Sequence, residues 1–138
     1  MYKGKKSQES NFCDVDAILL KDKDLAVVIE IEESKDDPTT IFGKYTTTAM
    51  SDCHIIGKEE IKIAKKSVRF IQIIDTKNQN EQKTKMIKKY RLIEDEINDN
   101  LYGSVKSYKI ICVNGKRIKE KNIFNKFEEE FNKALKEV

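Results

Sequence analysis

Two short apolar segments near the start of the chain are rich in branched residues. Residues 15–20 (VDAILL) and 25–32 (LAVVIEIE) flank a polar KDKD stretch, and this pattern predicts a β-hairpin. Pro38 follows the second segment and predicts a helix start, because proline suits the first turn of a helix. Apolar and small side chains then recur at helical spacing on one face, at Ile41, Tyr45, Thr48, Ala49 and Cys53. We therefore expect a helix directly after the hairpin.

The rest of the chain alternates between strands and helices. Residues 68–74 (VRFIQII) and 105–113 (VKSYKIICV) have the composition of buried strands. Between them, residues 81–100 carry apolar side chains at steps of three and four, and this spacing predicts an amphipathic helix with Met86, Tyr90, Ile93, Ile97 and the following Leu101 on one face. The order of elements so far is strand, strand, helix, strand, helix, strand.

The end of the chain predicts a turn and a closing helix. Asn114 and Gly115 form a pair that tolerates a tight hairpin turn, so residues 116–118 are expected to return briefly as a strand. Asn122 is a plausible N-cap for a helix whose apolar face carries Phe124, Phe127, Phe131 and Leu135. Together the elements predict the α/β class, with a mixed central β-sheet flanked by helices.

The composition favours one folded domain over residues 1–138. The chain is 38% hydrophobic and 37% charged, and a chain of 138 residues buries enough surface for a single core. No apolar run is long enough to cross a bilayer, and the first ten residues lack the apolar stretch of a signal peptide. Cys13, Cys53 and Cys112 are too few and too widely spaced for a disulfide framework or a paired zinc site. We therefore expect reduced thiols, a cytoplasmic protein and no membrane partner.

The charges are divided unevenly along the chain. The formal net charge is only +3. Residues 14–37 hold nine acidic and three basic residues, a net charge of −6, whereas residues 57–91 hold eleven basic and four acidic residues, a net charge of +7. The near-neutral total therefore hides an acidic segment and a basic segment.

The acidic segment places carboxylates at the open end of the predicted hairpin. Because side chains alternate along a strand, Asp14 and Asp16 share one face of the first strand, and Glu30 and Glu32 share one face of the second. If both acidic ends lie on the same side, Asp16 faces Glu30, with Cβ atoms about 5 Å apart. Carboxylates that close repel each other, and Mg²⁺ or Mn²⁺ would compensate their charge. The alternative is a set of solvated acids at strand ends.

The register of the hairpin tests this arrangement. For Asp16 to face Glu30, the loop must contain the three residues 22–24, since a two-residue loop would put Asp16 on the wrong face. A β-bulge would achieve the same correction.

Other polar residues are weaker candidates for a site. Gln72 alternates with Phe70 and Ile74, so both a buried, hydrogen-bonded glutamine and a substrate contact fit the pattern. His54 lies beside Cys53, but no second pair follows at zinc spacing, which favours a structural histidine.

The acidic pattern resembles that of the PD-(D/E)XK nuclease superfamily. Asp16 matches the Asp of one hairpin strand, Glu30 matches the acidic residue of the triplet on the next strand, and Glu32 stands in the place of the Lys. The resemblance covers residues 14–74 and implies a restriction-endonuclease-like fold. Because only about a dozen residues precede Asp14, we expect the helix and strand that open the family fold to be absent or abbreviated. Glu9 is the only glutamate upstream and is more typical of a solvated tail residue than of a ligand.

The resemblance implies a Mg²⁺-dependent DNA endonuclease in which Asp16, Glu30 and Glu32 act as catalytic residues and metal ligands. Lys44, one turn into the predicted helix, is in a position to replace the missing Lys or to contact the substrate. Cations beside an anionic site would hold a phosphate backbone, and the candidate nucleic-acid contacts are Lys44, Lys58, Lys62, Lys65, Lys66, Lys85, Lys88 and Lys89. The expected partners are double-stranded or branched DNA and a second copy of the chain. The alternative for the basic segment is a solvated face. The alternative for the whole protein is a non-catalytic nucleic-acid-binding or assembly module on the same fold.

Overall fold

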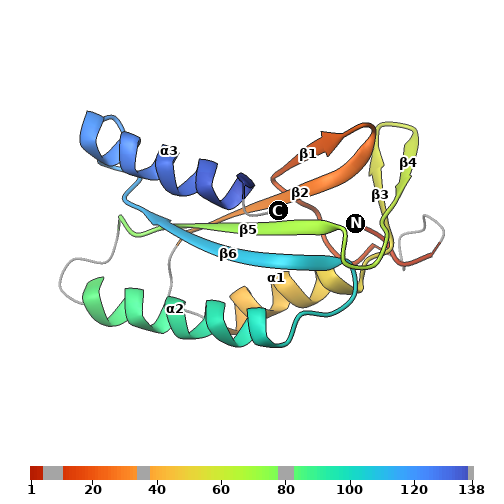
Figure 1. The fold of residues 1–138 in the computed structure, drawn as a ribbon, viewed down its shortest axis with the longest axis horizontal. Helices are drawn as coiled ribbons and strands as arrows, with labels where there is room; N and C mark the ends of the chain where they lie inside the picture. The colour runs from red at the N-terminus through yellow and green to blue at the C-terminus, as the bar shows by residue number, and fades with distance from the viewer. Residues whose placement is uncertain (5–10, 34–37, 78–82, 137–138) are drawn as a thin grey trace.

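The protein folds into a four-stranded sheet with helices on both faces (Figure 1). The computed structural model describes residues 1–4, 11–33, 38–77 and 83–136. Strands and helices follow one another as β1 (Ala17–Lys21), β2 (Asp24–Glu33), α1 (Pro38–Met50), β3 (Cys53–Ile56), β4 (Glu59–Lys62), β5 (Val68–Asp75), α2 (Lys83–Asp99), β6 (Val105–Val113) and α3 (Lys121–Lys136). The start of the predicted helix at Glu81 lies outside the described residues.

The sheet is mixed, as the sequence predicts. Its strand order is β1-β2-β5-β6, in which β1 is antiparallel to β2 while β2, β5 and β6 are parallel. Helices α1 and α2 cover one face and α3 covers the other (Figure 1). This arrangement confirms the α/β class with a mixed sheet flanked by helices.

Alternation along the strands separates two apolar cores. Val28, Phe70 and Ile110 face α1 and α2, where they pack with buried side chains such as Ile41 and Tyr90. On the opposite face, Val27, Ile71 and Ile111 pack against Ala134 and the partly buried Phe131 of α3. Strand β5 is buried on both faces, which accounts for its nearly continuous apolar sequence.

The turn between β1 and β2 differs from the predicted three-residue loop. Lys21 pairs with Asp24, so the loop contains only Asp22 and Lys23, whose φ angles of 52° and 74° suit a tight primed turn. The register then shifts between Leu19 and Leu20 at a β-bulge. Prediction of the loop was wrong, but the bulge restores the register that brings the start of β1 toward Glu30.

A second hairpin, β3–β4, was missed by the sequence analysis. The predicted helix face extended to Cys53, but α1 ends at Met50, and Cys53 and His54 belong to β3. Gly57 takes a positive φ of 59° in the turn to the charged strand EEIK. The predicted return strand at 116–118 is also absent from the described structure, because Asn114 instead accepts hydrogen bonds from Lys116 and Arg117 in a turn that leads into α3.

Helix α2 covers the outer edge of β6 with polar side chains. Asn98 binds both backbone groups of Tyr108, and Glu94 accepts the amide hydrogen of Ile110. Arg91 donates to the carbonyl oxygen of Ile110. These contacts satisfy backbone groups that an edge strand would otherwise expose to pairing with another chain.

Within the described residues, no helix is both long enough and apolar enough to cross a membrane. All three cysteines lie in that part of the chain and none forms a disulfide. Cys53 is buried, while Cys13 and Cys112 are partly buried.

Candidate active site

Glu30 is a charged residue type in the interior of the protein. It lies on β2, which pairs with β1 on one side and β5 on the other, and it faces the α1 and α2 layer together with Val28. Its side chain is 1% exposed. One of its carboxylate oxygens, Oε1, is buried and has no hydrogen-bond partner among the described residues. A buried carboxylate with an unpaired oxygen is costly in free energy.

Lys44 brings the compensating charge from α1. Its Nζ atom lies 3.5 Å from Oε2 of Glu30 and 3.5 Å from Oε1 of Glu32. Helix α1 is held over this part of the sheet by the buried side chains of Ile41 and Tyr45, and Lys44 lies at the edge of this buried face. The lysine side chain is 34% exposed, so Lys44 lies between the buried Glu30 carboxylate and the solvent.

The protonation of Glu30 reflects these surroundings. Burial raises the pKa of its carboxyl group from 4.5 to about 7, although the charge of Lys44 opposes the shift. The proximity of the Asp16 carboxylate raises this pKa further. For Lys44, burial lowers the pKa, but Glu30 and Glu32 outweigh burial and leave the pKa above its ordinary value.

Asp16 lies on the same side of the hairpin as Glu30. It precedes β1, and the ladder of paired residues ends one position away, at Ala17 and Ile29. Its Oδ2 atom accepts the amide hydrogen of Ile31 at 2.7 Å. The β-bulge and this hydrogen bond fix the Asp16 carboxylate near Glu30, which is the juxtaposition that the metal-site argument requires.

Gln72 and Tyr108 extend the polar row across the sheet. Gln72 is the neighbour of Glu30 in the parallel ladder and is fully buried. Its Oε1 atom accepts a hydrogen bond from the Tyr108 hydroxyl at 2.5 Å, while its Nε2 atom is buried without a partner in the described structure. The sequence left the face of Gln72 open. Its place in the register of β5 beside Glu30 makes it a member of the site.

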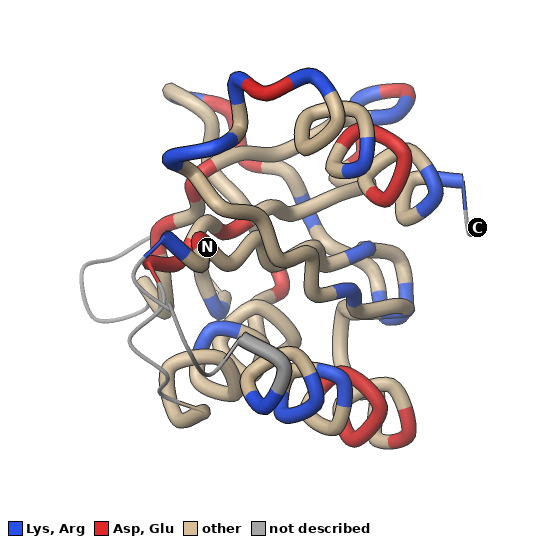
Figure 2. Tube along the Cα trace, turned by 90° about the vertical axis from the view of Figure 1, so that its left-hand side faces the viewer, with Lys and Arg blue, Asp and Glu red and all other residues tan. Residues whose placement is uncertain are grey.

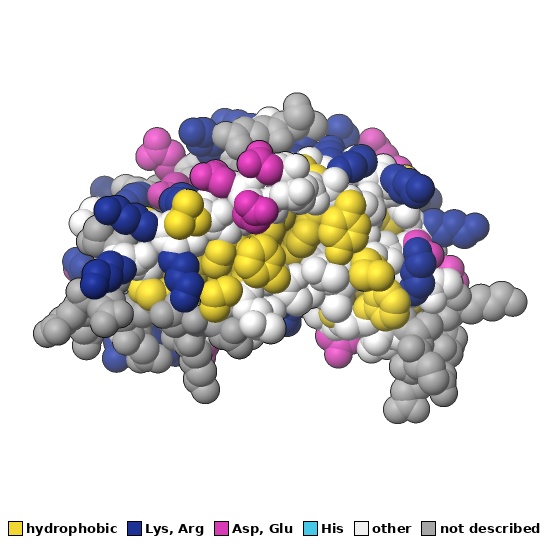
Figure 3. Space-filling view, turned by 90° about the horizontal axis from the view of Figure 1, so that it is seen from below, with side chains coloured by type: hydrophobic (Ala, Val, Ile, Leu, Met, Phe, Trp, Pro, Cys, Tyr) yellow, Lys and Arg dark blue, Asp and Glu magenta, His cyan; other side chains and the backbone are white. Residues whose placement is uncertain are grey.

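The predicted basic residues do not gather around this site. Lys58 and Lys62 lie on the β3–β4 hairpin, and Lys65 and Lys66 lie in the connection to β5. The other three lie near the start of α2, which begins on the side of the sheet where β5 ends: Lys85, Lys88 and Lys89. Basic residues appear in both helical layers in Figure 2, and the view from below in Figure 3 shows basic side chains at both ends of a hydrophobic band. Of the predicted contacts, Lys44 alone is ion-paired with the carboxylates in the part of the chain that the structure describes.

The donor set fits a cation held by two carboxylates better than one held by three. In the described ranges, no group of three or more His, Cys, Asp and Glu side chains is arranged to hold a metal ion. Asp16 lies beside Glu30, and Lys44 lies 3.5 Å from a carboxylate oxygen of both Glu30 and Glu32. Mg²⁺ is commonly bound by one or two carboxylates together with water and substrate phosphate, so two acids suffice for it. Glu9 lies outside the described residues.

No family model, no curated protein and no solved structure matches this chain. The chemistry of the site therefore rests on its own geometry, above all on Glu30, Asp16 and Lys44.

Proposed function

We propose that this protein is a divalent-metal-dependent nuclease that hydrolyses phosphodiester bonds in DNA. The observation that carries the proposal is the buried Glu30 carboxyl group, which has one unpaired oxygen, a pKa of about 7 and Asp16 beside it. Such a group is costly unless a cation binds it, and strongly shifted carboxyl groups concentrate at functional sites.

The placement of the residues supports a restriction-endonuclease-like arrangement. A hairpin carries Asp16 and Glu30, helix α1 follows, and β5 returns parallel to β2. The PD-(D/E)XK pattern has a lysine two positions after the second acid, where this chain has Glu32. Here the ammonium group of Lys44, on α1, lies close to the carboxylates of Glu30 and Glu32. We assign to Lys44 the role of the missing lysine and to Glu32 the role of holding Lys44 in place.

The roles follow from charge and position. Asp16 and Glu30 would hold Mg²⁺ or Mn²⁺, an ion that polarises a scissile phosphate and lowers the pKa of a bound water. Lys44 offsets the negative charge of the phosphate and donates hydrogen bonds toward the attacking water or the phosphate oxygens. Gln72, which is buried beside Glu30, limits the directions in which the Glu30 carboxylate turns.

A second candidate function is a non-catalytic nucleic-acid-binding or assembly module on the same fold. The observation in its favour is the pair of contacts from Lys44 to Glu30 and Glu32, which compensates both carboxylates without a metal. This candidate predicts neither cleavage nor a rise in melting temperature with divalent ions.

The test is a cleavage assay on plasmid, linear duplex, single-stranded and branched DNA with Mg²⁺ or Mn²⁺. We expect cleavage by the parent protein and a loss of about a hundredfold or more in Glu30→Gln, which keeps the side-chain shape and removes the charge. Glu59→Gln makes the same change on an exposed strand and serves as the control.

Thermal unfolding with and without the ions separates the two candidates. An ion that binds only the folded protein raises the melting temperature, and this rise should disappear in Glu30→Gln. If the parent protein neither cleaves DNA nor gains stability from Mg²⁺ or Mn²⁺, the nuclease proposal fails and the module is favoured.

We also propose double-stranded or branched DNA as the substrate and a homodimer as the active form. A chain of 138 residues offers a small footprint for duplex DNA, and two-fold symmetry would double it. Light scattering of the protein with and without duplex DNA tests this proposal, and a monomer in both conditions contradicts it.

A further inference from the structure

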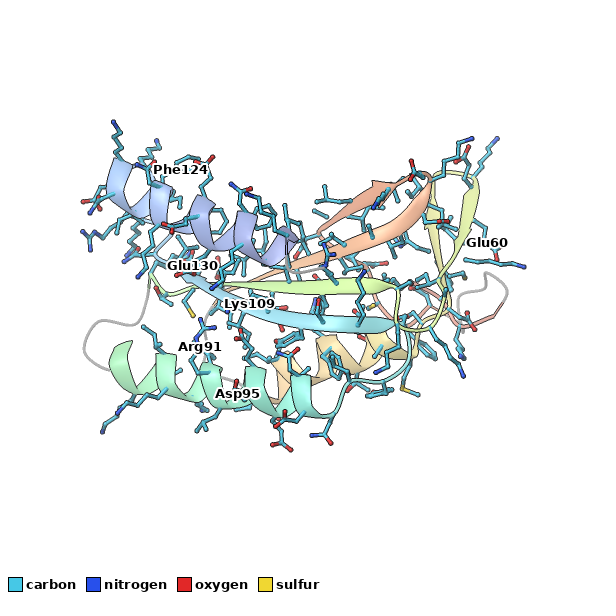
Figure 4. The ribbon with its side chains drawn as sticks, viewed as in Figure 1. Glu60, Arg91, Asp95, Lys109, Phe124 and Glu130 are labelled. Carbon is cyan, nitrogen blue, oxygen red and sulfur yellow. The ribbon has the colours of Figure 1, made fainter. Side chains whose placement is uncertain are left out.

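A basic cavity lies beside the edge strand β6, between helices on opposite faces of the sheet. Its volume is about 450 Å³, and its walls come from α2, β6, the following turn and α3. We call this cavity the basic pocket, because its charged lining residues are five bases and one acid. They are Arg91, Lys109, Arg117, Lys126, Lys133 and Glu130. In Figure 4, Arg91 of α2, Lys109 of β6 and Glu130 of α3 flank the space between the two helices.

The basic side chains are held in place by acids outside the lining. Arg91 lies 2.8 Å and Lys109 lies 3.2 Å from oxygens of Glu94, so one carboxylate serves two cations. Glu94 is itself fixed, because it accepts the amide hydrogen of Ile110 at 2.6 Å. The side chains of Arg91 and Lys109 remain 38% and 35% exposed, so they keep donor hydrogens for a ligand.

The charges leave this pocket positive. Arg117 pairs with Glu120 at 2.6 Å, and Glu130 lies in the lining. Even without Lys133, the four bases Arg91, Lys109, Arg117 and Lys126 outnumber the three acids Glu94, Glu120 and Glu130. A concave surface with a surplus of cations concentrates field lines and attracts anions. Planar guanidinium groups and lysine ammonium groups suit phosphate oxygens in particular.

The position and the uncharged walls also favour a ligand. Thr76 and Asn114 place the pocket just beyond the ends of β5 and β6, and the carboxyl ends of parallel strands are where open α/β sheets bind ligands. Ile123 and Phe127 form an apolar wall, and the Phe127 ring stacks on Phe131 with centroids 5.9 Å apart. A flat aromatic surface next to fixed cations suits a base joined to a phosphate.

We infer that the basic pocket binds a phosphate-bearing ligand, with Arg91, Lys109, Arg117 and Lys126 contacting the phosphate and the Phe127 wall contacting the attached group. This site is separate from the carboxylates of Asp16 and Glu30, and the inference does not depend on cleavage. The same chemistry is offered by a free nucleotide and by the backbone of a nucleic acid.

The test measures binding without divalent ions, by calorimetry and by thermal unfolding, with three probes. The probes are pyrophosphate, adenosine diphosphate and a single-stranded oligonucleotide. We expect at least one probe to bind and the double variant Arg117→Gln/Lys126→Gln to bind it about tenfold more weakly. For the oligonucleotide, the slope of log affinity against log salt should fall by about 1.4, because about 0.7 is lost for each contact removed from a single strand.

The control is Lys21→Gln/Lys23→Gln, which removes the same charge from the exposed turn between β1 and β2. Binding of pyrophosphate or adenosine diphosphate that survives in the control supports a site for free nucleotides. Binding of the oligonucleotide alone, with the same dependence on Arg117 and Lys126, supports a backbone contact. The inference is overturned if no probe binds, or if both double variants weaken binding equally. Cleavage by a protein that fails this test would leave the proposed nuclease function standing.

Discussion

The ammonium group of Lys44 lies 3.5 Å from a carboxylate oxygen of Glu30, which joins helix α1 to the interior of the sheet. The same ammonium group lies 3.5 Å from Glu32. The positive charge therefore comes from a helix, although the strand pattern E-x-E carries no lysine of its own. The charge balance of the site depends on how α1 packs on β2.

Replacing Lys44 should raise the pKa of Glu30 further. The Lys44 charge lowers this pKa against the effect of burial, so Lys44→Met should move it above its value of about 7. A carbon-detected NMR titration of the Glu30 carboxyl group measures the change. Lys62→Met, on the exposed end of β4, should leave the titration unchanged. An unchanged or lower pKa in Lys44→Met would contradict the ion pair.

The stability of the protein should fall between pH 4.5 and pH 7 because of Glu30. Its pKa of about 7 in the folded state exceeds the ordinary value of 4.5, so in this window the folded protein binds more protons than the unfolded chain. Stability is therefore lost as the pH rises through this window. At pH 8 the shifted pKa of Glu30 lowers the free energy of unfolding by roughly 3 kcal/mol, relative to a group with the ordinary pKa.

Glu30→Gln should remove this pH dependence. Its stability relative to the parent protein should be greater at pH 8 than at pH 4.5, as measured by urea unfolding at the two pH values. Comparing variant and parent at the same pH removes the effect of the other titrating groups, and the exposed Glu59→Gln serves as the control. An equal difference between parent and Glu30→Gln at both pH values would show that Glu30 titrates normally.

Gly103→Ala should be strongly destabilising. Gly103 has a φ of 60°, and a Cβ atom there would lie 1.8 Å from the backbone oxygen of Ala49. The same oxygen accepts the amide hydrogen of Ser104, so α1 and the loop before β6 have little room to separate. We expect a loss of more than about 2 kcal/mol in unfolding free energy. Gly57→Ala also has a positive φ but meets open space, so its loss should be closer to about 1 kcal/mol.

Asn98→Ala should weaken the protected edge of β6. Asn98 donates to the carbonyl oxygen of Tyr108 at 2.9 Å and accepts its amide hydrogen at 3.0 Å. Loss of both bonds should cost about 2 kcal/mol in urea unfolding and increase self-association, because an edge strand with open backbone groups pairs with other chains. Asn100 lies just after α2, and among the described residues its side chain bonds only to Glu96, so Asn100→Ala should stay within about 0.5 kcal/mol of the parent. Equal effects of the two variants would argue against edge protection.

Local sequence patterns determined most of the elements of this fold. Alternation and branched residues located β2, β5 and β6, and the spacing of Met86, Tyr90, Ile93 and Ile97 located α2. These signals work because a strand or helix that buries one face must repeat its apolar residues with its own period. The same alternation placed Glu30 and Glu32 on one face of β2.

Features that depend on contacts between distant residues were decided only by the tertiary structure. The β3–β4 hairpin was missed because the EEIK strand is short and charged, so it carries no apolar period. A two-residue loop with a bulge and a longer loop without one give the same facing of Asp16 and Glu30, so alternation does not distinguish them. Burial of Glu30, the approach of Lys44 and the separation of the lysines all depend on where helices pack. Packing position is set by the shapes of both surfaces in contact, and the sequence period of either one does not specify it.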